Sequence, residues 1–325
     1  MENEIQFNNR LNLQDLQASV QQVKGELSKV IVGQKKVADL LLTALFAEGH
    51  VLLEGAPGVA KTITAKLLAK SLSVGFNRVQ FTPDLMPSDV LGTSIFNLKN
   101  SEFEFKKGPI FSNIILADEI NRAPAKTQAA LFEVMEERQV TMDGNRYKLE
   151  APYMIIATQN PIEQEGTYRL PEAQLDRFLF KITIDYPNLE EEIEILTREH
   201  ELKMPKLDKI TTSLSQEKII EFQGIINQII VEPHLIQYIA SIIANTRTNA
   251  FLYLGASPRA SIAILKASKA YAAINGRDFV TPEDIKQIAI PVLQHRIIVT
   301  PEREMEGITT VQIINDILQS VEIPK

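Results

Sequence analysis

The sequence predicts a three-layer α/β domain with a parallel sheet, followed by an all-α domain. Short apolar runs of strand length alternate with helix-length amphipathic segments as far as about residue 185, and only helical periodicity follows. Such alternation favours parallel strands joined by crossover helices. A chain of 325 residues also exceeds what one core usually spans. Because turn-forming residues occupy 185–188, we expect domains at 1–188 and 189–325.

Apolar periodicity predicts the elements of the first domain in turn. An apolar residue recurs every three or four positions at Leu13, Leu16, Val20, Val23 and Leu27, which predicts an N-terminal helix packed on the core. Helices are then expected at 35–48, 62–72 and 125–137, with strands at 50–54, 76–81, 113–117 and 153–158. Stretches 94–105 and 139–149 alternate apolar and polar residues around a turn, which predicts two inserted β-hairpins.

The second domain is predicted to be helical throughout. Its helices are expected at 190–201, 216–231, 233–246, 258–275, 282–293 and 309–321. Thr281 is expected to cap one helix, with Pro282 at the first helical position. Ser257 and Pro258 repeat this pattern and place Arg259 in the first turn of another helix.

Composition limits the classes of function. The chain is 45% hydrophobic and 23% charged, which is typical of a folded globular protein. It has no cysteine, so disulfides and thiolate metal sites are excluded, and its four histidines lack metal-ligand spacing. The net charge of −7 disfavours nucleic acid as a partner. The sequence has neither a secretory signal nor an apolar run long enough for an integral membrane segment, so we expect a cytoplasmic protein.

The strongest chemical signal is a loop between the strand at 50–54 and the helix at 62–72. Its residues are Gly55, Ala56, Pro57, Gly58, Val59, Ala60, Lys61 and Thr62. Such a loop points backbone N–H groups at a phosphate chain, with the lysine on the β- and γ-phosphates and the hydroxyl on Mg²⁺. Ala60 stands where the usual pattern has glycine, and we expect a negative φ there. The alternative is a Gly-Pro turn before a lysine-rich helix.

Polar side chains follow two further strands. Asp118 and Glu119 end an apolar strand, where the first carboxylate can hold the Mg²⁺ shell and the second can polarise an attacking water. Asn160 follows the strand at 153–158 and could orient the same water. The alternatives are an acidic turn and an ordinary turn residue before proline.

Two arginines complete the candidate site. Arg177 lies in the stretch beyond Asn160, and Arg259 lies in the first turn of a helix, where a cation opposes the helix dipole. An arginine tolerated there often has an anionic partner such as a γ-phosphate. For each arginine, solvation or a structural ion pair remains the alternative.

The chain resembles the AAA+ ATPases, specifically the MoxR family in the helix-2-insert clade. The matching segments are VGQ at 32–34, GAPGVAKT at 55–62, QFTPDLMPSDVLG at 80–92, ILADEINRAPAKTQAALFEVMEE at 115–137, ATQNP at 157–161, EGTYRLPEAQLDRF at 165–178 and SPRA at 257–260. They span nearly the whole chain. The resemblance implies a P-loop AAA+ core with inserted hairpins and a helical lid. Alanine at the position of Ala60 is usual in this family.

The resemblance also implies roles for individual residues. These are Lys61 and Thr62 as the Walker A pair, Asp118 and Glu119 as Walker B, Asn160 as sensor 1, Arg177 as an arginine finger for the neighbouring subunit, and Arg259 as sensor 2. Ile31, Val32, Gly33 and Gln34 match the stretch that lines the adenine pocket, and Ile63 completes the nucleotide-binding set. Arg169 could be a second inter-subunit arginine, and Gln80 could be a polar switch residue.

The implied activity is Mg²⁺-dependent ATP hydrolysis in a chaperone-like role. The family acts in maturation or metal loading of protein complexes, often with partners that carry von Willebrand factor A domains. This sequence has no Asp-x-Ser-x-Ser motif of such a domain, so that partner would be a separate protein. Two alternatives remain: a nucleic-acid motor of the related helicase branch, and a nucleotide-gated scaffold without turnover.

The arginines predict an assembly as well. Arg177 is expected on an outward side of the α/β domain, where it would not reach its own Lys61, whereas Arg259 on the lid would. A head-to-tail ring in which each Arg177 completes the next subunit's site follows from this placement. The resemblance makes six the expected number of subunits.

Overall fold

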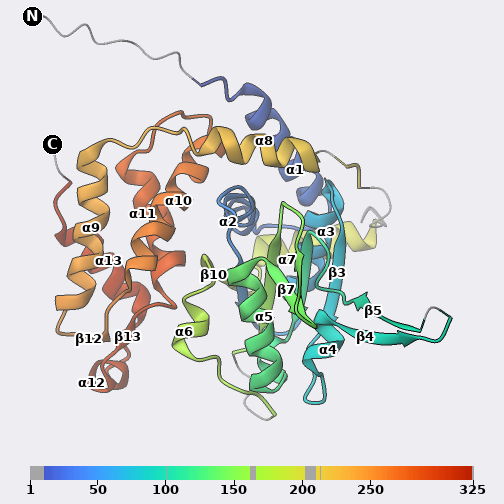
Figure 1. Cartoon of the computed structure of the whole chain (residues 1–325). Helices are drawn as coiled ribbons and strands as arrows, with labels where there is room; N and C mark the ends of the chain where they lie inside the picture. Colours follow the sequence, from blue (N-terminus) through green and yellow to red (C-terminus); the bar gives the residue numbers. More distant parts are fainter. Residues whose placement is uncertain (1–10, 100, 162–165, 202–209, 213, 324–325) are drawn as a thin grey trace, which may run out of the picture.

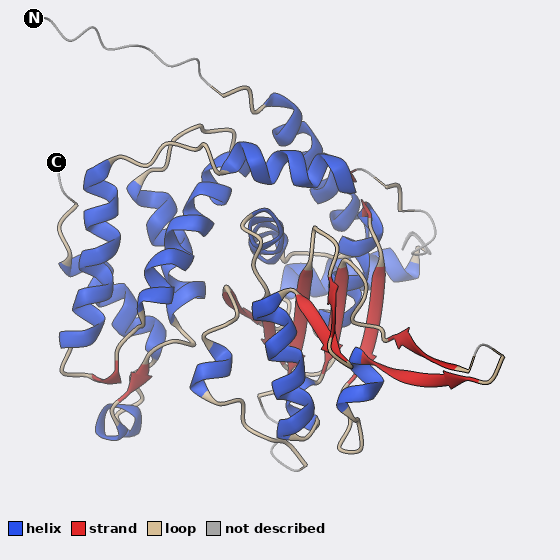
Figure 2. Cartoon of the chain, viewed as in Figure 1, coloured by secondary structure: helices blue, strands red, loops and turns tan. Residues whose placement is uncertain are grey.

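The computed structural model of the chain describes residues 11–99, 101–161, 166–201, 210–212 and 214–323 (Figure 1). Residues 1–10, where no secretory signal was found, and Glu165 of the motif at 165–178 lie outside the described residues. Figure 2 shows most of the strands in one half of the molecule and a bundle of helices in the other.

Five parallel strands form the central sheet, in the order β10-β1-β9-β6-β3. Their bounds are Val51–Gly55 (β1), Phe76–Gln80 (β3), Ile114–Asp118 (β6), Met154–Gln159 (β9) and Phe180–Ile184 (β10). Four of them were predicted. The fifth, β10, was not, and it extends the sheet beyond β1 with Val51 opposite Phe180. Its polar residues Lys181 and Thr183 alternate with apolar ones because β10 is an edge strand.

The two faces of the sheet carry separate cores, which confirms the three-layer prediction. Leu53 and Leu116 belong to a core shared with helices α1 (Gln14–Val30), α2 (Lys35–Phe46) and α3 (Lys61–Ser71). The adjacent residue in each strand faces the opposite side, because side chains alternate in a strand. Leu52 and Ala117 accordingly pack with α5 (Ala125–Glu137) in a second core.

Both predicted hairpins are present. The first pairs β4 (Gly92–Asn97) with β5 (Glu102–Lys107), and the second pairs β7 (Gln139–Met142) with β8 (Asn145–Lys148). The first hairpin projects from the body of the molecule (Figure 1). The two hairpins contact each other through Phe105 and Tyr147, whose ring centroids lie 4.5 Å apart.

The second half is a bundle of helices, as predicted, with a small antiparallel pair of strands added. The helices after residue 188 are α7 (Leu189–His200), α8 (Gln216–Ile226), α9 (Pro233–Thr248), α10 (Pro258–Ile274), α11 (Pro282–Leu293), α12 (Pro301–Met305) and α13 (Thr310–Ser320). Of these, α7 lies beside the α/β half and not in the bundle (Figure 1), and its Arg198 donates to Ser28 O of α1 at 3.0 Å. The strands are β12 (Leu252–Leu254) and β13 (Ile298–Val299). Short elements elsewhere are β2 (Leu72–Ser73), α4 (Pro87–Leu91), η1 (Ile120–Arg122), α6 (Glu172–Leu175) and β11 (Leu214–Ser215).

The two predicted helix caps behave differently. Thr281 caps α11 as expected, because its side chain accepts a hydrogen bond from Asp284 N, with Pro282 in the first turn. Ser257 is the N-cap residue of α10, with Pro258 in the first turn, as predicted, but its side chain makes no capping hydrogen bond. Its hydroxyl instead donates to Asp176 Oδ2 at 3.0 Å.

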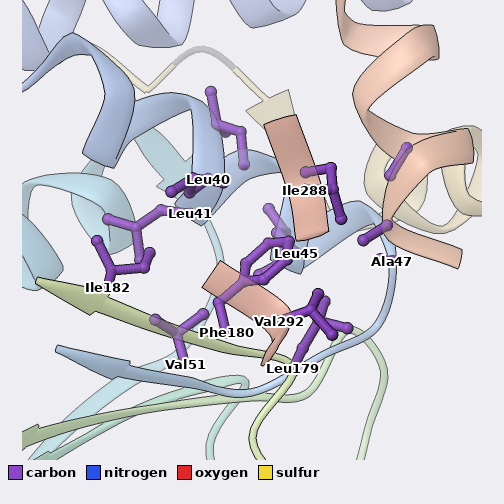
Figure 3. Close-up of a cluster of buried hydrophobic side chains, with 14 of the residues drawn as sticks. Leu40, Leu41, Leu45, Ala47, Val51, Leu179, Phe180, Ile182, Ile288 and Val292 are labelled. Atoms are coloured by element: carbon purple, nitrogen blue, oxygen red, sulfur yellow. The ribbon is translucent and has the colours of Figure 1, made fainter. Parts of the chain in front are cut away.

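The helical bundle is docked on the sheet through apolar side chains. Ile288 and Val292 of α11 pack in the same buried cluster as Leu45 of α2 and Phe180 of β10 (Figure 3). This contact fixes where the bundle presents its residues to the α/β half. The boundary between residues 188 and 189 stays a prediction. Within the described part of the chain, every helix is too short or too polar to cross a membrane.

Candidate nucleotide-binding and hydrolysis site

The glycine-rich loop joins β1 to α3, and Lys61 is the first residue of the helix. Its ammonium group lies inside the loop, donating to the carbonyl oxygens of Gly55 and, at 3.2 Å, Ala56. A third carbonyl, that of Gln159 at the end of β9, accepts at 3.5 Å. Burial lowers the pKa of Lys61, and the carboxylates of Asp118 and Glu119 oppose that shift. A cation held by neutral carbonyls at a helix N-terminus suits a bound phosphate chain.

Ala60 has a left-handed backbone with φ of 61°, so the expectation of a negative φ is wrong. The helix begins only at Lys61, and Ala60 forms the turn that leads into it. Ala60 O accepts from both Thr64 N and Thr64 Oγ1 at 2.9 Å, which holds the turn in place. A left-handed alanine costs on the order of 1–2 kcal/mol, so this loop stores local strain.

The metal end of the site lies between α3 and β6. Thr62 Oγ1 donates to Asp118 Oδ2 at 3.1 Å, although the two residues come from separate motifs. Asp118 is buried, and its Oδ1 accepts from the Thr158 hydroxyl, which in turn accepts from Glu119 N at 2.9 Å. Mg²⁺ prefers oxygen ligands and keeps several waters, so this hydroxyl–carboxylate pair fits it. No group of three or more acidic, histidine or cysteine side chains that could hold a metal occurs among the described residues.

Glu119 leaves the strand with a left-handed backbone, φ 55°. Its Oε2 accepts from Gln80 Nε2 at 2.9 Å and pairs with Arg122 Nε at 2.9 Å. The side chain is 39% exposed, so water can reach it. Asn160 directly follows β9, the sheet neighbour of β6, which brings it to the same edge as Glu119.

The stretch 31–34 lies against the phosphate loop. Gln34 Nε2 donates to Val59 O at 3.3 Å, and Gly33 and Gln34 both have positive φ. A cavity of about 420 Å³ opens beside this stretch, lined in part by Ile31, Gly33 and Thr64. The φ of 72° at Gly33 favours glycine, and a Cβ there would also push aside the flexible end of the Glu191 side chain of α7. Val32 is buried, and Ile63 is half-buried against the adjoining core.

Arg177 and Arg259 share one acidic partner. Arg177 Nη2 lies 2.8 Å from Glu136 Oε2, and Arg259 Nη2 lies 2.6 Å from Glu136 Oε1. Arg177 Nη1 also donates to Phe132 O. In this structure Arg259 therefore pairs with Glu136, whereas we expected it to turn toward its own Lys61. The prediction that Arg177 does not reach its own Lys61 stays a prediction. The structure brings the two arginines together in the last turn of α5.

A buried ion pair explains this placement. Arg296, 3% exposed, donates from Nε to Asp176 Oδ1 at 2.7 Å and from Nη2 to Asp176 O at 3.0 Å. The Ser257 hydroxyl donates a hydrogen bond to the other carboxylate oxygen of Asp176. Asp176 directly precedes Arg177, and its hydrogen bond from Ser257 ties this segment to the start of α10. Arg259 follows two positions after Ser257, so both arginines are held near each other. Burial lowers the pKa of Arg296, and the hydrogen bond to Asp176 opposes that shift.

Sequence reasoning missed several residues of this region. Arg78 precedes Gln80 by two positions on β3, so strand periodicity could have placed them on one face. Glu136, Asp176 and Arg296 carried no local signal, because their partners are distant in the sequence. Arg169, considered as a further inter-subunit arginine, is exposed.

Comparisons with known proteins agree with this architecture. Residues 50–180 match the ATPase family associated with various cellular activities (AAA), and residues 244–317 match the AAA lid domain. A crystal structure of a Cytophaga hutchinsonii protein assigned as an ATPase superposes with a TM-score of 0.88 at 45% identity, covering 96% of this chain and 97% of that one. Fold and phosphate loop together define an AAA+ ATPase.

Two full-length relatives narrow the family. The uncharacterized protein YeaC of Bacillus subtilis is 45% identical over 96% of this chain and 97% of its own length. Chaperone MoxR1 of Mycobacterium tuberculosis is 42% identical over 92% of this chain and 81% of its own. The chain belongs to the MoxR family of AAA+ ATPases.

Proposed function

We propose that this protein hydrolyses ATP to ADP and phosphate with Mg²⁺. The observation that carries the proposal is the hydrogen bond of 3.1 Å between Thr62 Oγ1 and Asp118 Oδ2, beside the ammonium group of Lys61. It joins the phosphate loop to the carboxylate strand, and Glu119 follows directly. Mg²⁺ when bound would neutralise charge on the phosphates.

Each predicted residue has a role in this proposal. Lys61 and the loop N–H groups bind the phosphates, with Thr62 and Asp118 at the metal. Glu119 takes a proton from the attacking water, and Asn160 orients that water. Val32, Gly33 and Gln34 bind the adenine base of the nucleotide. Arg177 and Arg259 stabilise charge that develops on the γ-phosphate.

We further propose that the active form is a ring, with six subunits as the leading number. Arg177 and Arg259 are held together on Glu136, so one head-to-tail contact would present both to a neighbouring phosphate loop. The role we propose is chaperone-like, on protein clients in the cytoplasm, in maturation or metal loading. The name of one relative, Chaperone MoxR1, supports the chaperone-like part of this proposal. A separate von Willebrand A-domain protein is the partner we propose to look for.

Phosphate release measured with and without EDTA tests the activity. Glu119→Gln should bind ATP as the wild type does and lose turnover, because the amide cannot accept the proton of the attacking water. Glu221→Gln on α8 makes the same change at an exposed position outside the site and should keep full turnover. Wild-type turnover in Glu119→Gln would contradict the assignment of the base.

The same assay separates the alternatives. Binding of ATP without turnover, even with partner proteins added, would indicate a nucleotide-gated scaffold. Turnover stimulated by DNA or RNA, with salt-dependent binding, would indicate a nucleic-acid motor. Affinity isolation with Glu119→Gln should recover protein clients.

A further inference from the structure

An arginine lies on the carboxylate that is proposed to serve the metal. Arg78 of β3 donates to Asp118 Oδ2 from Nη2 at 2.7 Å and from Nε at 3.1 Å. This is the same oxygen that accepts from Thr62. Strands β3 and β6 are adjacent, with Gln80 opposite Asp118 and Arg78 opposite Leu116, so Arg78 reaches two positions along the ladder to make the contact. The Asp118 side chain is 8% exposed and that of Arg78 is 43% exposed, so the arginine approaches from the solvent side.

A magnesium ion and this guanidinium would compete for Asp118 Oδ2. Mg²⁺ demands near-octahedral oxygen ligands at about 2.0–2.1 Å, directly or through its tightly held waters. Arg78 already donates hydrogen bonds to that oxygen, and the Thr62 hydroxyl donates a further one. Two cations at such short range also repel each other strongly where the carboxylate is buried. Arrival of the metal therefore requires Arg78 to leave.

Arg78 is connected to Glu119 as well. Its Nη2 donates to Gln80 Oε1 at 2.9 Å, and Gln80 Nε2 donates to Glu119 Oε2 at 2.9 Å. Both side chains come from the same face of β3, two residues apart. A continuous chain of hydrogen bonds therefore connects Asp118, the proposed metal ligand, with Glu119, the proposed base. When Arg78 moves, Gln80 loses the donor that orients its amide.

We propose that Arg78 is a positioning residue that competes with the divalent metal for Asp118. Without a metal it supplies the counter-charge to that carboxylate, and Gln80 connects it to Glu119. Binding of the metal with nucleotide displaces Arg78 from Asp118. The inference rests on the proposed function, because it assumes that nucleotide brings a metal to Thr62 and Asp118.

Metal affinity tests the competition without measuring turnover. Mn²⁺ would be titrated into the full-length protein saturated with AMP-PNP, with free Mn²⁺ followed by electron paramagnetic resonance. Arg78→Met removes the competing cation and should bind Mn²⁺ about tenfold more tightly, since hydrogen bonds to charged groups have net effects of that order. Arg78→Lys keeps a cation and should stay near wild-type affinity. Lys106→Met removes an exposed charge from the first hairpin and should change nothing.

The outcomes separate this inference from the function on which it rests. If wild-type protein binds neither AMP-PNP nor Mn²⁺ with it, the proposed function fails. If the wild type binds both, and Arg78→Met has unchanged or weaker Mn²⁺ affinity, the competition is overturned. Should Arg78→Met fail to fold by circular dichroism, Arg78→Gln replaces it with the same expectation. In wild-type crystals with AMP-PNP and Mg²⁺, Arg78 should have left Asp118 Oδ2, and a structure with both cations on that oxygen would refute the proposal.

Discussion

Arg177 of the α/β half and Arg259 of the helical bundle form ion pairs with the two oxygens of a single carboxylate, at 2.8 Å and 2.6 Å. That carboxylate belongs to Glu136, which lies in the last turn of α5 and is 38% exposed. Exposed ion pairs add little to stability, typically about 0–1 kcal/mol. The value of the arrangement is geometric, because two guanidinium groups that face one anion are pre-oriented for another, such as a γ-phosphate.

Arg177→Ala tests whether the arginine acts on a neighbouring subunit. ATP affinity should be kept while turnover falls by about 10³-fold or more, because an arginine finger acts on charge that develops only in the transition state. Mixing this variant with Lys61→Ala should restore part of the activity, since some mixed interfaces pair an intact finger with an intact loop. Phosphate release from the mixture measures this.

Failure of that complementation is informative only if mixed rings form, which differently tagged subunits and co-purification would establish. An inactive mixture of proven mixed rings would mean that Arg177 does not act between subunits.

Arg177 and Arg259 should be energetically coupled. In a double-mutant cycle on turnover with Arg177→Ala and Arg259→Ala, we expect a coupling energy of about 0.5–3 kcal/mol, because each removal changes the charge that Glu136 presents to the other. Arg177→Ala combined with Arg303→Ala, whose arginine lies over the Phe251 ring in the bundle, should be additive. Additive effects for the first pair would show that the shared carboxylate has no functional consequence.

Ala60→Gly should stabilise the protein, because glycine adopts the φ of 61° without strain. The gain should be about 0.5–1 kcal/mol, since relief of the left-handed alanine outweighs the greater unfolded-state entropy of glycine. Urea unfolding measures it. Ala129→Gly at an exposed position within α5 should instead lose about 1 kcal/mol. Equal losses at both positions would contradict the strain at Ala60.

Stability should fall in mild acid because two histidines are buried. Burial lowers the pKa of His50 to about 4, and it lowers the pKa of His295 as well. The unfolded chain therefore binds more protons than the folded one between about pH 6.5 and about pH 4. The stabilisation is complete above that window and is lost as the pH falls through it.

From about pH 7.5 to about pH 5, His50 alone should cost about 2 kcal/mol of unfolding free energy. His50 accepts from Ile155 N at 3.0 Å and contacts Met135 O at 3.1 Å, which favours the neutral ring. His50→Gln should flatten the pH dependence by that amount in urea titrations, whatever its effect at neutral pH. An unaltered slope would rule out His50 as the source.

Much of the phosphate end of the site could be predicted from the sequence. The loop at 55–62 and the strand ending in Asp118 and Glu119 are local patterns, and parallel strands necessarily bring their carboxyl ends to one edge. The two hairpins could be predicted equally well, because alternating apolar and polar residues around a turn form a local pattern of a few positions. The roles of the site residues stay predictions.

Tertiary structure decided what local patterns do not encode. Strand β10 was not predicted, because its short alternation of apolar and polar residues identifies a strand only once its pairing with β1 is known. The left-handed Ala60, the hydroxyl of Ser257 on Asp176 and the arginine on Asp118 each depend on a partner or a turn that spacing alone does not specify. Arg259 meets Glu136 across 123 positions of sequence, because docking of α11 on the sheet and the buried Arg296–Asp176 pair bring the two chain segments together. Local periodicity thus determined which residues could do chemistry on phosphate, and long-range packing decided which charges face one another.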